Sequence, residues 1–162
     1  MAEAKKGSSV ASEELEDMVA ASDTGSRKLG GVPNKILLGT AAAWSLFQLW
    51  IASPLPYMVG FGVFSATESR SIHLAFALFL AFMAYPAFNR SPRDHVPLTD
   101  WIMGGVAAFA GAYLFIFYAE LAQRPGAPIL QDVVVAVVGM LLLLEATRRS
   151  LGPPLMIVAI VF

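Results

Sequence analysis

The residues of this sequence that could do chemistry are two histidines and a few carboxylates and arginines. A haem held by two histidines needs both rings at matching depth on facing helices. His73 lies early in a long apolar segment, whereas His95 lies in the polar stretch that follows it. We therefore expect no shared iron site, and we expect the His73 ring to hydrogen-bond a neighbouring backbone group or Glu68. The histidines, aspartates and glutamates show no metal-ligand spacing, and no cysteine is present.

The deepest carboxylate in an apolar segment is Glu145. Arg148 and Arg149 follow it at i+3 and i+4, on the same face of a helix. This spacing predicts a structural ion pair at the end of the segment. The alternative role is a proton or ion relay, because ionisable groups at membrane depth are often functional. Other charges lie nearer to segment ends, where Glu120 precedes Arg124 by four residues and Asp132 opens a helix.

No catalytic motif accompanies these residues. The sequence lacks a nucleophile elbow, a Walker loop, a dinucleotide-binding fingerprint and an HExxH motif. The central part of every long apolar segment is uncharged. We therefore expect this chain to be no enzyme, to hold no cofactor or metal, and to form a poor solute pathway by itself.

The composition indicates a membrane protein. Of the 162 residues, 57% are hydrophobic and 14% are charged, and the mean hydropathy is +0.65. Soluble domains are about 45–50% apolar and about 25% charged, so a soluble globular enzyme is excluded. The net charge of −1 provides no basic field for nucleic acid.

Four segments are long enough for a helix to cross a bilayer, which takes about 20 residues. They are Lys35 to Ser53, Ser69 to Phe88, Thr99 to Leu121, and Ile129 to Thr147. A fifth apolar run, Leu155 to Phe162, predicts the truncated start of a further helix in a longer polypeptide; the alternative is a stub held by other protein. The expected fold is all-α, a polytopic membrane helix bundle with four transmembrane helices plus this truncated fifth.

Three parts follow from this pattern: a cytoplasmic tail (1–33), a four-helix transmembrane module (34–152) and the start of a further helix (153–162). In the polar tail, Ser12 can cap a short amphipathic helix that would rest on lipid headgroups or on a partner. Between the first two spans, Pro56, Gly60 and Gly62 interrupt an apolar stretch. We expect an interfacial or partly re-entrant connector there, without a continuous helix.

The positions of the basic residues predict the orientation. Alternate loops hold seven bases on one side and two on the other. The richer side has Arg27, Lys28, Lys35, Arg90, Arg93, Arg148 and Arg149, and the poorer side has Arg70 and Arg124. Because cytoplasmic loops are enriched in lysine and arginine, we expect a multi-pass protein of the bacterial inner membrane with a cytoplasmic N-terminus.

The third apolar segment carries small residues at helical spacing. They are Gly104, Ala108, Gly111 and Ala112. Such a ridge lets two helices approach closely in lipid, so we expect helix packing there; the alternative is that glycine and alanine are simply common in spans. Thr99 and Asp100 directly follow Pro97 and its neighbour Leu98, and are expected to form the cap and first turn of this helix.

Six segments of the chain together resemble a transporter family. They are SEELEDMVAASDTGSRKL (12–29), AWSLFQLW (43–50), ESRSIHLAFALFLAFMAYPAF (68–88), SPRDHVPLTDW (91–101), LFIFYAELAQRPG (114–126) and LLLLEATRRSLG (141–152). In this order they are similar to the amino-terminal part of fused permeases of tripartite ATP-independent periplasmic (TRAP) transporters of the type paired with TAXI-class binding proteins. The resemblance runs from about Ser12 to Phe162.

This resemblance implies a function for the chain. The four-helix part would be the small Q-type module, a scaffold bound to a large M-type transport module that holds the substrate and sodium sites. A periplasmic TAXI-type binding protein would deliver an organic anion, a dicarboxylate or an amino acid, and a sodium or proton gradient would drive uptake. The alternatives are a membrane-anchor subunit of a haem or quinone enzyme and a free-standing membrane adaptor.

Overall fold

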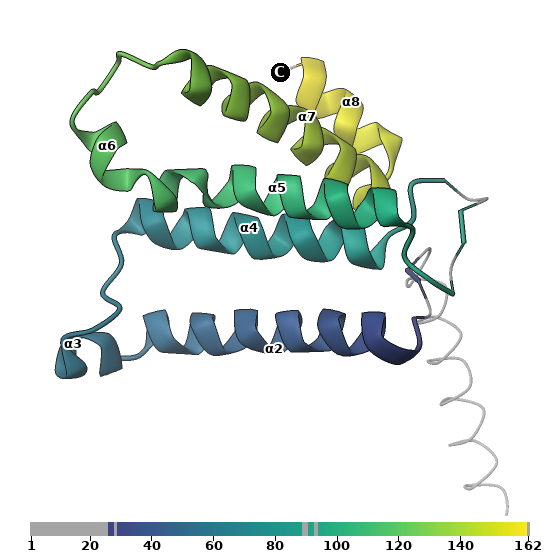
Figure 1. Cartoon of the computed structure of the whole chain (residues 1–162), viewed down its shortest axis with the longest axis horizontal. Helices are drawn as coiled ribbons and strands as arrows, with labels where there is room; N and C mark the ends of the chain where they lie inside the picture. Colours follow the sequence, from purple (N-terminus) through teal and green to yellow (C-terminus); the bar gives the residue numbers. More distant parts are fainter. Residues whose placement is uncertain (1–25, 28, 89–90, 93, 162) are drawn as a thin grey trace, which may run out of the picture.

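The computed structural model describes residues 26–27, 29–88, 91–92 and 94–161, and these residues fold into helices with no strand. The helices, labelled as in Figure 1, are α2 (Gly31–Ala52), α3 (Leu55–Val59), α4 (Ala66–Ala84), α5 (Leu98–Ile116), α6 (Tyr118–Ala122), α7 (Leu130–Leu151) and α8 (Pro153–Val161). The prediction of an all-α fold is confirmed for this part of the chain. The expected tail helix beginning at Ser12 lies outside the described residues.

Among the helices of the described residues, three are long and apolar enough to cross a membrane: α2, α5 and α7. This agrees with a membrane protein. Helix α4 is not among them, because Glu68, Arg70 and His73 lie in its first turns and lower its hydropathy. The fourth predicted span therefore stays a prediction.

Two helix ends differ from the expected ones. Helix α4 stops at Ala84 and not at Phe88, because the residue before Pro86 is driven out of the helical region; Tyr85 has φ −111° and ψ 125°. The third predicted segment is divided at Phe117, whose φ of −106° and ψ of 23° separate α5 from α6. No proline or glycine marks this second break in the sequence.

The connector between α2 and α4 is interrupted at its glycines. Helix α3 ends at Gly60 with φ +71°, and Gly62 has φ +66°; both lie in the left-handed region that favours glycine. Helix α4 then begins with a capping box, in which the Glu68 amide donates to Ser65 Oγ at 3.2 Å and the Ser65 amide donates to Glu68 Oε2 at 2.7 Å.

The core lies between α4 and α5, which run side by side (Figure 1). Phe82 and Ala107 are fully buried there, next to Met83. Helix α7 is inclined across α5, and α8 turns back beside α7 after Gly152. Helix α2 lies on the other side of α4 and buries none of its residues. The strongest packing is therefore at the α4–α5 interface and where α7 joins it.

Candidate functional site: a buried arginine–carboxylate cluster

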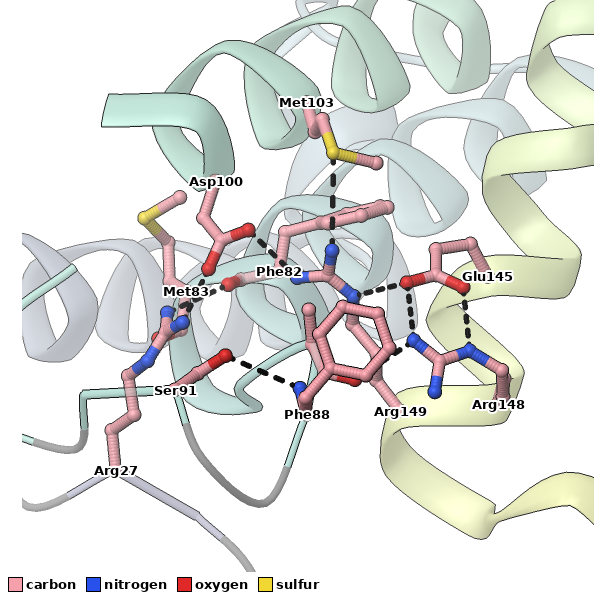
Figure 2. Close-up of polar contacts among 11 residues, drawn as sticks. Arg27, Phe82, Met83, Phe88, Ser91, Asp100, Met103, Glu145, Arg148 and Arg149 are labelled. Atoms are coloured by element: carbon pink, nitrogen blue, oxygen red, sulfur yellow. Dashed lines mark hydrogen bonds and ion pairs between the residues drawn. The ribbon is translucent and has the colours of Figure 1, made fainter. Parts of the chain in front are cut away.

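Five charged residues meet where the end of α4, the start of α5 and the end of α7 come together (Figure 2). We call Arg27, Asp100, Glu145, Arg148 and Arg149 the arginine–carboxylate cluster. Arg27 comes from the chain before α2, Asp100 from the first turn of α5, and the other three from the last turns of α7. The cluster therefore links three segments that are distant in the sequence.

Asp100 is the centre of the cluster. It is only 3% exposed, and it forms ion pairs with Arg27 and, at 2.9 Å, with Nη1 of Arg149. Asp100 lies in the first turn of α5 as expected, but the expected cap is wrong, because the N-cap is Pro97 and no side chain caps the helix. The Asp100 carboxylate pairs with two guanidinium groups and does not cap its own helix.

Arg27 closes the end of α4. Its amide donates to the carbonyl of Ala84 at 2.8 Å, and its Nη1 donates to the carbonyls of Phe82 and Met83, each at 3.2 Å. The last carbonyls of a helix have no partner inside the helix, so Arg27 supplies the missing donors. Arg27 belongs to the predicted cytoplasmic tail, yet this residue is buried.

Glu145 lies between the two arginines of its own helix. Both of its oxygens accept hydrogen bonds at 2.7 Å from Arg148, and Oε1 also accepts one at 2.7 Å from Arg149. Arg148 further donates to the carbonyl of Ala87 at 2.9 Å. The guanidinium carbon of Arg149 lies 4.6 Å from the centre of the Phe82 ring, a cation–π contact.

The cluster is suited to holding helices together. Three guanidinium groups share two carboxylates, and a guanidinium does not give up its proton in proteins. The contacts are thus fixed, charge-assisted hydrogen bonds, and the guanidinium groups that hold the Glu145 carboxylate cannot accept a proton from it. The sequence contained one indication that a further carboxylate such as Asp100 joins the cluster. Two arginines follow a single Glu145, so one positive charge is left without a partner on its own helix.

The small residues of α5 divide into two pairs. Gly104 and Gly111 face α4 so closely that an added Cβ would lie 3.0 Å from Met83 Cε and 2.9 Å from the Ala75 backbone nitrogen, respectively. At Gly111 the carbonyl also accepts a hydrogen bond from Ser71 Oγ at 2.6 Å. The other pair, Ala108 and Ala112, lines a cavity of about 500 Å³ that is shared with α2 and α4.

The two histidines lie apart, because His73 belongs to α4 and His95 to the chain before α5. His73 Nδ1 accepts a hydrogen bond of 2.7 Å from the indole nitrogen of Trp44 on α2. The expected backbone or Glu68 partner is therefore wrong, because the Glu68 carboxylate is occupied by its capping box. His95 is exposed and lies 3.0 Å from Asp94, whose own backbone hydrogen bond lowers its pKa.

A second polar group lies at the opposite end of α7. Asp132 accepts a hydrogen bond of 2.5 Å from Tyr113 and one of 3.2 Å from Arg124, and it also accepts from the Ile129 amide at 3.0 Å. The last contact places Asp132 at the start of α7, as expected. Arg124 thus pairs with Asp132 and not with Glu120, among the described ion pairs. Sequence spacing gave no sign of Tyr113.

Within the described ranges, no group of three or more histidine, aspartate or glutamate side chains could hold a metal ion. Comparisons of the chain with protein-family models, with curated proteins and with solved structures found no match.

Proposed function

We propose that this chain is the scaffold membrane module of a TRAP-type secondary transporter permease. In this role it supports ion-gradient-driven uptake of an organic anion, a dicarboxylate or an amino acid, which a periplasmic TAXI-type protein delivers. The solute and coupling-ion sites belong to a large M-type transport module that it binds. The resemblance of residues 12–162 to this family is the basis for the names of these partners.

The observation that carries the scaffold role is the position of Asp100. Its buried carboxylate joins Arg27 and Arg149, so that the tail, α4, α5 and α7 are fastened at one end. A moving transport element needs to change its contacts, whereas breaking a buried ion pair is costly. The middle turns of α5 and α7 carry no charged residue. Both features favour a fixed framework over a solute pathway.

Reconstitution tests this proposal. The chain alone in liposomes should move no organic anion under a sodium or proton gradient, whereas the same liposomes with the large module and the binding protein should take it up. Solute uptake by the chain alone would overturn the scaffold role. Uptake by the large module that does not change when the chain is removed would favour a free-standing adaptor, and a Soret band in the purified protein would favour a haem enzyme.

Replacing Glu145 with glutamine distinguishes a structural ion pair from a relay. We expect the amount of assembled complex to fall while the turnover per assembled complex stays unchanged, because Arg148 and Arg149 lose the charge between them. Size-exclusion yield and uptake per complex measure the two effects. Glu120→Gln, at an exposed position on α6, is the control. A collapse of turnover in fully assembled complex would support the relay.

The proposed location is the bacterial inner membrane, with the N-terminus in the cytoplasm. Reporter fusions after Gly31, Arg93 and Ser150 are expected to report the cytoplasm, and a fusion after Gly126 the periplasm, because the bases favour this orientation. The fusion after Arg93 also tests whether α4 spans the membrane. A periplasmic signal after Arg93 would show that the fourth predicted span does not cross.

A further inference from the structure

A cavity of about 620 Å³ lies in the trough between α4, α5 and α7, away from the arginine–carboxylate cluster. Its walls are almost entirely aliphatic. They include Leu74 of α4, Ala110 and Leu114 of α5, and Val133, Ala136 and Met140 of α7. The volume is typical of small-molecule binding sites.

The trough exists because α7 is not parallel to α5 (Figure 1). The two helices approach closely at Gly139, where an added Cβ would lie 3.2 Å from the Cβ of Ala110. The Tyr113–Asp132 hydrogen bond joins them again near the start of α7. These two contacts fix how α7 lies against α5 beside the apolar cavity.

One end of the cavity is polar. Tyr113 and Asp132 contribute to its lining, and Arg124 pairs with Asp132 through one nitrogen. The Arg124 side chain is 23% exposed, and a guanidinium has five N–H donors. The site thus combines a long apolar wall with a partly exposed cation at one end of a membrane-spanning helix.

We propose that this cavity binds one acyl chain of a membrane phospholipid, whose phosphate lies at Arg124. Apolar cavities of this kind exclude water, and α5 and α7, which line this one, are long and apolar enough to lie in the hydrocarbon of a bilayer. A helix of a partner protein fits the cavity less well. A helix is about 10 Å wide and rises 1.5 Å per residue, so only about five of its residues would fill the cavity volume. Arg124 uses one nitrogen for Asp132, so its other N–H groups can donate to the phosphate. This inference does not depend on the proposed transport role.

Photo-labelling tests the acyl-chain site. The full chain is reconstituted into liposomes of phosphatidylethanolamine and phosphatidylglycerol that contain a phosphatidylethanolamine with a diazirine in one acyl chain. Adducts are expected to concentrate on peptides that contain Leu114 and Met140. Ala136→Phe should fill the cavity and reduce these adducts several-fold, whereas Leu141→Phe, at an exposed position of α7 outside the cavity, should leave them unchanged.

Two results would overturn the proposal. One is an adduct yield in Ala136→Phe equal to that in Leu141→Phe, and the other is an even distribution of adducts over all helices. Val133→Phe, at an exposed part of the cavity wall, replaces Ala136→Phe if the latter is not recovered folded. A diacylglycerol with the same diazirine chain should label several-fold less, and equal labelling would show that Arg124 does not bind the phosphate.

Discussion

Replacing Asp100 with asparagine is expected to destabilise the protein by about 3–5 kcal/mol, which is the usual cost of removing one partner from a buried ion pair. The change leaves Arg27 with only the carbonyls at the end of α4 and takes from Arg149 one of its two carboxylates. Both arginine side chains are at most 2% exposed, so water cannot replace the lost contact. The unfolding midpoint in mixed detergent–SDS micelles measures the effect.

Asp94→Asn is the matched control for this experiment. Asp94 precedes α5 in the same region of sequence, but its side chain is 83% exposed, and an exposed ion pair contributes at most about 1 kcal/mol. The Asp94 variant should therefore unfold close to wild type. Equal midpoints for the two variants would show that the ion pairs of Asp100 contribute no stability.

Gly111→Ala is expected to destabilise the protein by about 1–3 kcal/mol, the usual cost of overpacking a tight interface. The new Cβ would lie 2.9 Å from the Ala75 nitrogen and 3.0 Å from its Cα. Both atoms belong to the α4 backbone, which cannot move aside like a side chain, so the two helices would have to separate. The same unfolding assay measures the loss.

Gly105→Ala is the control for the small-residue ridge. An added Cβ at Gly105 meets no atom within 4 Å, and alanine is a better helix former than glycine by about 1 kcal/mol. We expect this variant to be as stable as wild type or more stable. If both alanine variants gained stability, the close approach of α4 and α5 at Gly111 would not be needed.

The helices could be predicted from the sequence because helix formation depends on residues that are close together in the chain. Length and hydropathy identified α2, α5 and α7, since a helix closes its backbone hydrogen bonds within one segment and needs only an apolar exterior in lipid. The expected end of α4 was wrong although Pro86 marks it in the sequence. The break at Phe117 has no such marker.

The charged residues show which ion pairs can be predicted from sequence spacing and which cannot. Arg148 and Arg149 lie within reach of Glu145 because residues three and four apart share a helix face. The same rule suggested Glu120 for Arg124, yet Arg124 contacts Asp132 across the loop between α6 and α7. The spacing of residues along a helix identifies the partners that a side chain could reach. Which partner it contacts depends on how the chain folds beyond that helix.

By itself, the sequence determined that the described part of this chain is all-helical, with apolar helices long enough for a membrane and charges only near their ends. Only the tertiary structure decided that Asp100 joins Arg27 and Arg149, which are 73 and 49 residues away, and that α7 leaves a cavity of about 620 Å³ against α4 and α5. The physical reason is that a buried charge requires a partner but does not specify which one. The way the helices cross determines which partner the buried charge contacts.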